Sequence, residues 1–239
     1  MNRFFVDKLL TENEQLILPD EVSHHWCKVL RAKIGDTAIL FNGQGGEYTA
    51  TLTDADKKSA TVHLTTHNPI NRTPPYTVTL GQVMSRGERM DYAIQKATEM
   101  GVRHIQLLTS EHCQEHLKYE RDKKKLTHWQ NIAIAACEQC GLNIVPTILP
   151  PIDLKSWLST HQSKLKLMMA VSDGKFIPRD LPDDITLLVG PEGGLSDAEI
   201  ELAITHGFHA WTIGERVLRT ETAPVVALAA LQTLHAIGQ

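Results

Sequence analysis

The pattern of hydrophobic and polar positions divides the chain into a short β-rich part and a longer part with strands and helices. In the first part, apolar or alternating runs between turn signals predict strands at Thr37–Phe41, Glu47–Leu52 and Ala60–Leu64. One short helix is expected after Pro19-Asp20-Glu21. Its apolar face is expected to carry Val22, Trp26, Val29 and Leu30. This part is therefore predicted to be a small β module.

The rhythm changes after the segment from His67 to Pro75, which holds three prolines in nine residues and is predicted to be a linker. Beyond it, strands are expected at Tyr76–Val83, Ile105–Leu108, Leu165–Ala170, Ile185–Val189 and Ala210–Ile213. Helices are expected at Glu88–Met100, Lys124–Cys140, Ser196–Thr205 and Thr222–Ala236. This alternation indicates an α/β domain with a mostly parallel sheet covered on both faces. We predict one domain at residues 1–70 and a second at residues 71–239.

Composition excludes several classes of protein. The chain has 239 residues, of which 42% are hydrophobic and 22% charged, so disorder of the whole chain is excluded. No apolar run approaches the roughly 20 residues that span a bilayer, and Asp7 interrupts any signal-peptide core. Four cysteines are too few for a disulfide framework. We expect a soluble, cytoplasmic protein without a membrane partner.

The net charge of −4 does not support non-specific binding of nucleic acid. Any contact with RNA must therefore come from a local group of cations.

The densest candidate site is the loop Gly190-Pro191-Glu192-Gly193-Gly194, which follows a fully apolar strand. Ser196 and Glu199 then form a capping box at the start of the next helix. Ligands of open α/β sheets bind beyond the carboxyl ends of strands, and glycines let backbone amides approach them. The spacing matches neither a dinucleotide fingerprint nor a Walker loop. Taken alone, a tight structural turn is an equally good interpretation.

A second candidate loop follows one strand later and runs from Gly214 to Ala223. Thr220, Glu221 and Thr222 gather at the start of the last helix, where caps and acids are favoured. Simple helix capping, with Arg219 in a surface ion pair, is the alternative. Two polar, glycine-containing loops at neighbouring strand ends favour a ligand site over that alternative.

Two smaller motifs suggest metal or thiol chemistry. Cys137 and Cys140 form a CxxC, and His112 and His116 form an HxxxH. No second CxxC accompanies them, and the two cysteines lie within a helical pattern. We expect packed, reduced cysteines and no metal.

The two loops together resemble the ribosomal small-subunit methyltransferase E family. The similarity rests on GPEGG followed by LSxxEI, and on IGxRVLRTETA from Ile213 to Ala223. It extends to Arg3-Phe4-Phe5, to the stretch from His25 to Asp36, and to blocks at residues 81–88, 95–102 and 135–141. These are SPOUT-class enzymes that make 3-methyluridine in 16S rRNA. The resemblance implies an N-terminal PUA-like β-barrel module for RNA binding and a C-terminal α/β domain with a trefoil knot.

The resemblance also implies S-adenosylmethionine as methyl donor, a homodimer, and uridine-1498 of 16S rRNA in the small ribosomal subunit as target. One side of the cofactor site is expected to consist of Leu188, Gly190, Glu192, Gly193 and Gly194. The other side is expected to consist of Ile213, Gly214, Leu218, Arg219, Glu221, Thr222 and Ala223.

Transfer to uracil N3 requires loss of its proton. Arg219 is expected to stabilise charge on a uracil oxygen, and Glu221 or Glu192 to take or relay the proton. RNA contacts are expected from Arg3, His25, Arg31, Arg86 and Lys96. Relatives often carry arginine where this chain has Leu142 and Ile144, which removes cations from that region.

Two other functions remain open at the level of sequence. One is a SPOUT enzyme that methylates ribose 2′-oxygens of tRNA or rRNA. The other is a non-enzymatic RNA-binding factor for ribosome assembly that retains a cofactor-shaped loop.

Overall fold

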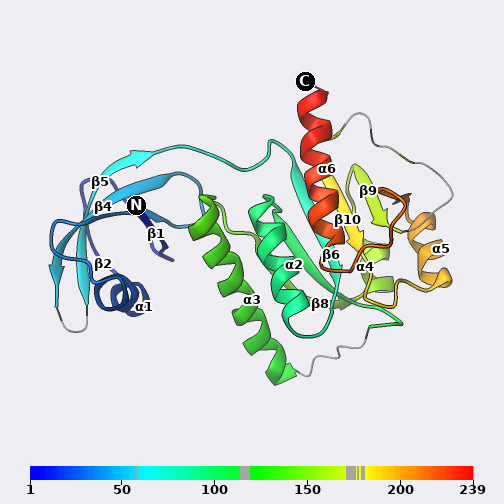
Figure 1. The fold of residues 1–239 in the computed structure, drawn as a ribbon, viewed down its shortest axis with the longest axis horizontal. Helices are drawn as coiled ribbons and strands as arrows, with labels where there is room; N and C mark the ends of the chain where they lie inside the picture. Colours follow the sequence, from blue (N-terminus) through cyan, green and yellow to red (C-terminus); the bar gives the residue numbers. More distant parts are fainter. Residues whose placement is uncertain (57–58, 114–118, 171–175, 177, 179–180, 239) are drawn as a thin grey trace. The chain divides into compact units, whose positions relative to one another are not determined.

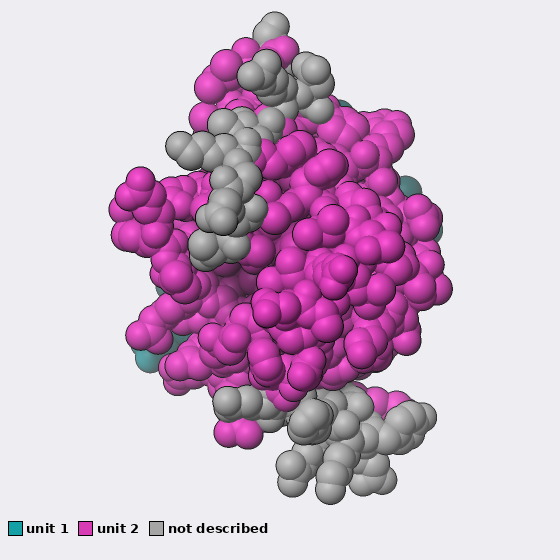
Figure 2. Space-filling view, turned by 90° about the vertical axis from the view of Figure 1, so that its right-hand side faces the viewer, with its two compact units in different colours: residues 1–73, 137–145 teal, residues 74–136, 146–239 magenta. Residues whose placement is uncertain are grey.

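The computed structural model describes residues 1–56, 59–113, 119–170, 176, 178 and 181–238. Contacts divide the chain into two compact units. Unit 1 contains residues 1–73 and 137–145, and unit 2 contains residues 74–136 and 146–239 (Figure 2). The expected division after residue 70 did not include the second segment of unit 1, which comes from far along the chain.

Unit 1 is built on a five-stranded mixed sheet with the order β1-β3-β4-β5-β2 (Figure 1). The strands are β1 (Asn2–Phe5), β2 (Gln15–Ile17), β3 (Thr37–Phe41), β4 (Glu47–Ala55) and β5 (Ala60–Asn68). β1 runs parallel to β3, and the other pairs are antiparallel. Its core includes Trp26, Leu40 and Leu52, all at most 1% exposed. The three predicted strands are confirmed, whereas the short β1 and β2 were not expected.

The predicted helix of unit 1 differs from its expected form. It consists of one α-helical turn, α1 (Asp20–Ser23), followed by a π-helix, η1 (His24–Val29). Leu30 N donates to His25 O, five residues back, so the turn is wider than 3.6 residues. Trp26 is buried as expected, but Val29 and Leu30 are 56% and 44% exposed. The predicted apolar face is therefore wrong at its last two positions.

Unit 2 is built on a six-stranded sheet with the order β11-β9-β10-β6-β7-β8, in which every pair is parallel. The strands are β6 (Thr77–Val83), β7 (His104–Thr109), β8 (Thr147–Asp153), β9 (Leu165–Met169), β10 (Asp184–Val189) and β11 (Phe208–Trp211). The helices are α2 (Glu88–Glu99), α3 (Tyr119–Cys140), α4 (Leu154–Thr160), α5 (Asp197–Thr205) and α6 (Ala223–Ile237). The last four residues of α3 belong to unit 1.

Helices cover both faces of this sheet. A Cβ on Gly81 of β6 would overlap the Trp157 ring of α4, so glycine allows α4 to pack closely there. The next residue, Gln82, points to the opposite face and bonds Thr220, just before α6. The predicted parallel sheet with two covered faces is confirmed.

Two elements of unit 2 were not predicted from the sequence, and the bounds predicted for a third were shifted. β8 contains Pro150 and Pro151, which argue against a strand, but β8 lies at the sheet edge, where proline is tolerated. The short α4 follows it directly and was not expected. β11 begins and ends two residues before its predicted range, since it spans Phe208–Trp211. Among the described residues, no helix is long and apolar enough to cross a membrane.

Candidate active site

A pocket of about 550 Å³ lies at the carboxyl ends of β9, β10 and β11. The strand register brings Met169, Val189 and Trp211 level with one another, and each strand ends there. The loops after β10 and β11 close the pocket. Its lining comprises Arg89, Met169, Ala170, Val189, Gly190, Pro191, Glu192, Gly194, Leu195, Ile200, Trp211, Thr212, Ile213, Arg216, Val217, Leu218, Arg219, Thr220, Glu221 and Ala223. This is the edge at which open α/β sheets bind ligands.

Most residues expected at the cofactor site line this pocket. They are Gly190, Glu192, Gly194, Ile213, Leu218, Arg219, Glu221 and Ala223. Four others are not in the lining, namely Leu188, Gly193, Gly214 and Thr222. Leu188 is fully buried inside β10, and a Cβ on Gly193 would lie 3.3 Å from His112 Cβ. The assignment of all twelve residues to the cofactor remains a prediction.

The loop after β10 is compact, and hydrogen bonds fix its end. A Cβ on Gly190 would lie 3.1 Å from Leu195 Cγ, so the loop folds closely onto itself at this glycine. The predicted capping box is confirmed, because Glu199 N donates to Ser196 Oγ and Ser196 N donates to Glu199 Oε2. Glu199 Oε1 also accepts a hydrogen bond from Glu111 N at 2.8 Å. The end of the loop is thereby fixed to the start of α5, and α5 is bonded to the segment after β7.

The charged groups around the pocket differ in their pairing. Arg89 Nη1 lies 2.7 Å from Glu192 Oε1, an ion pair that the sequence did not suggest. Burial raises the pKa of Glu192, but backbone hydrogen bonds and the Arg89 guanidinium outweigh it and lower the pKa below its ordinary value. Glu221 Oε2 is buried without a hydrogen-bond partner among the described residues. Arg219 is exposed, and its side chain pairs with no described residue.

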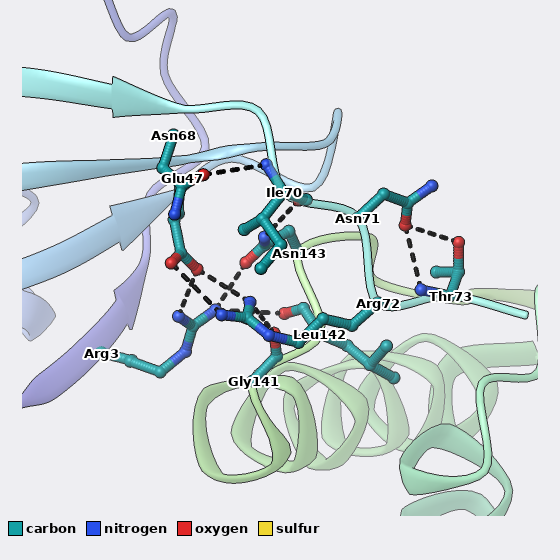
Figure 3. A network of polar contacts seen from close by, with 10 residues as sticks. All are labelled: Arg3, Glu47, Asn68, Ile70, Asn71, Arg72, Thr73, Gly141, Leu142 and Asn143. Atoms are coloured by element: carbon teal, nitrogen blue, oxygen red, sulfur yellow. Dashed lines mark hydrogen bonds and ion pairs between the residues drawn. The ribbon is translucent and has the colours of Figure 1, made fainter.

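Arg3, expected to contact RNA, is instead held inside unit 1 (Figure 3). Its side chain is 13% exposed and lies 2.6 Å from Glu47 Oε2. It also donates to Gly141 O and Asn143 Oδ1 at the end of α3. Arg72 completes the network, because Nη1 contacts both Glu47 Oε2 and Gly141 O. These bonds occupy both terminal nitrogens of Arg3, while its Nε is buried without a partner among the described residues. The geometry therefore favours a structural role over a phosphate contact.

The other residues expected to contact RNA have different surroundings. His25 and Arg31 are exposed on unit 1, and Arg31 has a φ of 57° just after η1. Arg86 is exposed at the carboxyl end of β6. Lys96 is bonded to Glu99 one turn along α2, with 2.7 Å between Nζ and Oε1. Lys28 and Lys33 were not predicted as RNA contacts. Both are exposed near Arg31, and the side chains of these two lysines form no ion pair with described residues.

Leu142, in the segment after α3, has an apolar environment. Leu142 is 6% exposed and packs in a cluster with Phe41 and Cys137 of unit 1. Burial, followed by the neighbouring Cys140, raises the pKa of Cys137 to about 12. Cys137 is therefore a packed thiol rather than a reactive one.

No group of three or more His, Cys, Asp or Glu suited to a metal occurs in the part of the chain that the structure describes. His116 of the HxxxH lies outside the described residues. The absence of a metal stays a prediction.

Two family profiles match the chain. An RNA methyltransferase domain matches residues 72–232, and an RNA methyltransferase PUA domain matches residues 18–65. Ribosomal RNA small subunit methyltransferase E of Buchnera aphidicola from Schizaphis graminum is 35% identical, over 96% of this chain and 95% of that protein. The enzyme of the same name from Bacillus subtilis is 29% identical, over 97% and 96%.

Solved structures agree with this assignment. Ribosomal RNA small subunit methyltransferase E from Neisseria gonorrhoeae, bound to S-adenosyl methionine, superposes with a TM-score of 0.92 at 39% identity and covers 98% of both chains. A Legionella pneumophila protein solved with the cofactor SAM also gives 0.92, at 38% identity over 97% of this chain and 96% of that one. The chain therefore belongs to the ribosomal RNA small subunit methyltransferase E family.

Proposed function

We propose that this protein transfers a methyl group from S-adenosylmethionine to N3 of uracil in uridine-1498 of 16S rRNA, within the small ribosomal subunit. The observation that carries the proposal is the pocket formed by the two loops after β10 and β11. Family membership supports a methyltransferase acting on small-subunit rRNA. The relative from Neisseria gonorrhoeae is bound to S-adenosyl methionine.

The pocket has the properties that S-adenosylmethionine requires. Its volume of about 550 Å³ lies in the usual range for small-molecule sites. Ile213, Leu218 and Ala223 provide apolar surface for an adenine ring, and the glycine loop exposes backbone polar groups. The buried, unpartnered Glu221 Oε2 offers an acceptor for a hydroxyl or amino group of a ligand. The residues present therefore fit this cofactor.

When bound, S-adenosylmethionine supplies a methyl group already activated on a sulfonium. The chain itself must orient the uracil and stabilise its anionic form. Arg219 suits the second task because it lines the pocket with a guanidinium that no described residue neutralises. We rank Arg219 first among the candidate catalytic residues.

Removal of the N3 proton falls to one of two glutamates. Glu192 is paired with Arg89, and its lowered pKa makes the carboxylate a weaker base. Glu221 has one carboxylate oxygen free of partners among the described residues. We therefore favour Glu221 as the group that takes or relays the proton.

Docking of RNA is assigned to unit 1, which contains the match to the PUA domain. A group of exposed basic residues lies in η1 and just after it, and it consists of His25, Lys28, Arg31 and Lys33. Phosphate contacts from such a group supply binding that an acidic chain otherwise lacks. Arg86 lies at the carboxyl end of β6 and remains a candidate contact beside the pocket.

Two further properties of SPOUT enzymes are part of the proposal. The strand order β11-β9-β10-β6 brings together loops from widely separated segments, which supports a trefoil knot around the pocket. The sheet of unit 1 is proposed to close as a PUA-like barrel. We also propose a homodimer, for which a solution mass of twice the chain mass is the test.

The function is tested with purified protein, labelled S-adenosylmethionine and small subunits from cells that lack this modification. Nucleoside mass spectrometry should identify 3-methyluridine. A 2′-O-methylnucleoside would instead assign the protein to ribose methylation. Binding of S-adenosylmethionine and subunits without any transfer would favour an assembly factor.

A further inference from the structure

A hydrogen bond joins the two loops that form the pocket. Thr220 Oγ1 lies 2.6 Å from Gly190 O, and both residues line the pocket. A carbonyl oxygen only accepts, so the Thr220 hydroxyl must donate its single proton to Gly190. The Gly190 carbonyl therefore accepts a hydrogen bond from the loop after β11.

A fully buried amide from a third segment orients this hydroxyl. Gln82 Nε2 lies 3.1 Å from Thr220 Oγ1 and 3.0 Å from Val83 O. Because Val83 O only accepts, the nitrogen end of the amide must face it. Gln82 therefore donates to Thr220, and Thr220 donates to Gly190, in one directional chain.

The position of Gln82 makes it suited to hold the loops. In the parallel pairing of β6 with β10, Gln82 lies opposite Val189, the residue before Gly190. The loops themselves contain Gly190, Gly194 and Gly214, and glycine allows many backbone conformations. A loop that is ordered before the ligand arrives loses less entropy when the ligand binds.

Stability alone does not explain an amide at this position. Gln82 is 0% exposed, and its Oε1 is buried without a partner among the described residues. A buried acceptor without a partner carries a free-energy cost. A methionine of similar size would avoid that cost, but it could not orient Thr220.

We propose that Gln82 and Thr220 are positioning residues, which hold the two loops in the conformation that binds the methyl donor. The inference rests on the proposed function, because the ligand is S-adenosylmethionine. It assigns no catalytic contact to either residue. The hydrogen-bond chain Gln82–Thr220–Gly190 orders the pocket before the ligand binds.

The first test removes the Thr220 hydroxyl without changing the side chain's size. Thr220→Val should weaken S-adenosylmethionine binding, measured by calorimetry, by about fivefold, the effect of one ordinary hydrogen bond. Thr220→Ser keeps the hydroxyl and should restore most of the affinity. The matched control is Thr98→Val, which removes another buried hydroxyl bond, to Ile94 O in α2. That control should lower the melting temperature and leave the affinity unchanged.

The second test separates positioning from stability. Gln82→Met should weaken S-adenosylmethionine binding several-fold while the melting temperature of the ligand-free protein stays equal or rises. The double variant with Thr220→Val should bind about as weakly as Thr220→Val alone, because both changes break the same chain.

The outcomes distinguish the two proposals. Wild-type protein that binds no S-adenosylmethionine overturns the proposed function and this inference with it. Wild-type binding with unchanged affinity in Thr220→Val and Gln82→Met overturns the positioning role alone. Loss of affinity that tracks loss of melting temperature in every variant, Thr98→Val included, also overturns it, since it shows a merely structural effect.

Discussion

The polar network of unit 1 and the pocket of unit 2 use the same kinds of side chain in opposite ways. In unit 1, the buried Glu47 carboxylate is matched by two guanidiniums, Arg3 and Arg72, which also bond carbonyls at the end of α3. In the pocket, Arg219 pairs with no described residue and Glu221 keeps a buried oxygen without a partner. Charged groups that bond one another hold a fold together, whereas charged groups that line a pocket without an ionic partner are available to a ligand.

The largest expected effect comes from the unpaired side of this comparison. Arg219→Ala should reduce methyl transfer by about 100- to 1,000-fold, the usual result of removing one group that stabilises a developing anion. Stability should change little, because the side chain is exposed. Single-turnover transfer to small subunits and a melting curve measure the two effects. A loss of stability with normal transfer would place Arg219 among the structural residues.

Substitutions in the ion-paired network of unit 1 should change the free energy of unfolding rather than methyl transfer. Glu47→Ala leaves Arg3 and Arg72 together without their counter-charge, which should cost about 3 kcal/mol of unfolding free energy. Arg72 is partly exposed, so the cost lies at the lower end for buried pairs. Denaturant unfolding measures it, and S-adenosylmethionine affinity at a temperature where the protein is folded should be unchanged. A weakened affinity without a stability change would contradict the comparison.

The pH dependence of stability tests the same network. Burial raises the pKa of Glu47, but its bonds from Arg72 and Arg3 outweigh burial and lower the pKa below 4.5. Its stabilisation is therefore present above pH 4.5 and lost as the pH falls through the lowered value. Glu138 behaves oppositely, because burial raises its pKa despite the bond from Phe5 N.

Unfolding curves across the acidic range should show these signs. The Glu47→Gln variant should lose less stability than the wild type when the pH falls, because its amide does not titrate. The matched variant Glu138→Gln should leave stability at pH 7 equal or higher, since it removes an unfavourably buried charge. The same acid dependence in wild type and Glu47→Gln would disprove the role of Glu47.

The smallest expected effect concerns exposed cations. Arg31→Ala should weaken subunit binding and reduce the slope of log affinity against log salt by about one for each lost phosphate contact. Arg3→Ala should instead lower stability with little change in the slope, because its guanidinium is already bonded. Binding titrations at several salt concentrations distinguish the two. If Arg3→Ala reduced the slope of log affinity against log salt, Arg3 would be an RNA contact after all.

Much of unit 2 was accessible from the sequence because its signals are local. An apolar run such as Ile185–Val189 predicts a buried strand, and Ser196 with Glu199 predicts a helix start. Both loops of the pocket were found from glycines and polar residues at strand ends. The site residues Arg219 and Glu221 were named through the resemblance that these loops carry.

What the tertiary structure decided depends on partners far apart in the chain. The bond from Gln82 to Thr220 spans 138 residues, and that from Arg3 to Asn143 spans 140. Periodicity and capping report only on neighbours within a few residues, so the sequence predicted Arg3 as an RNA contact and gave no role to Gln82. Whether a buried polar group is satisfied or free is a property of the assembled fold, because its partner is chosen by chain topology.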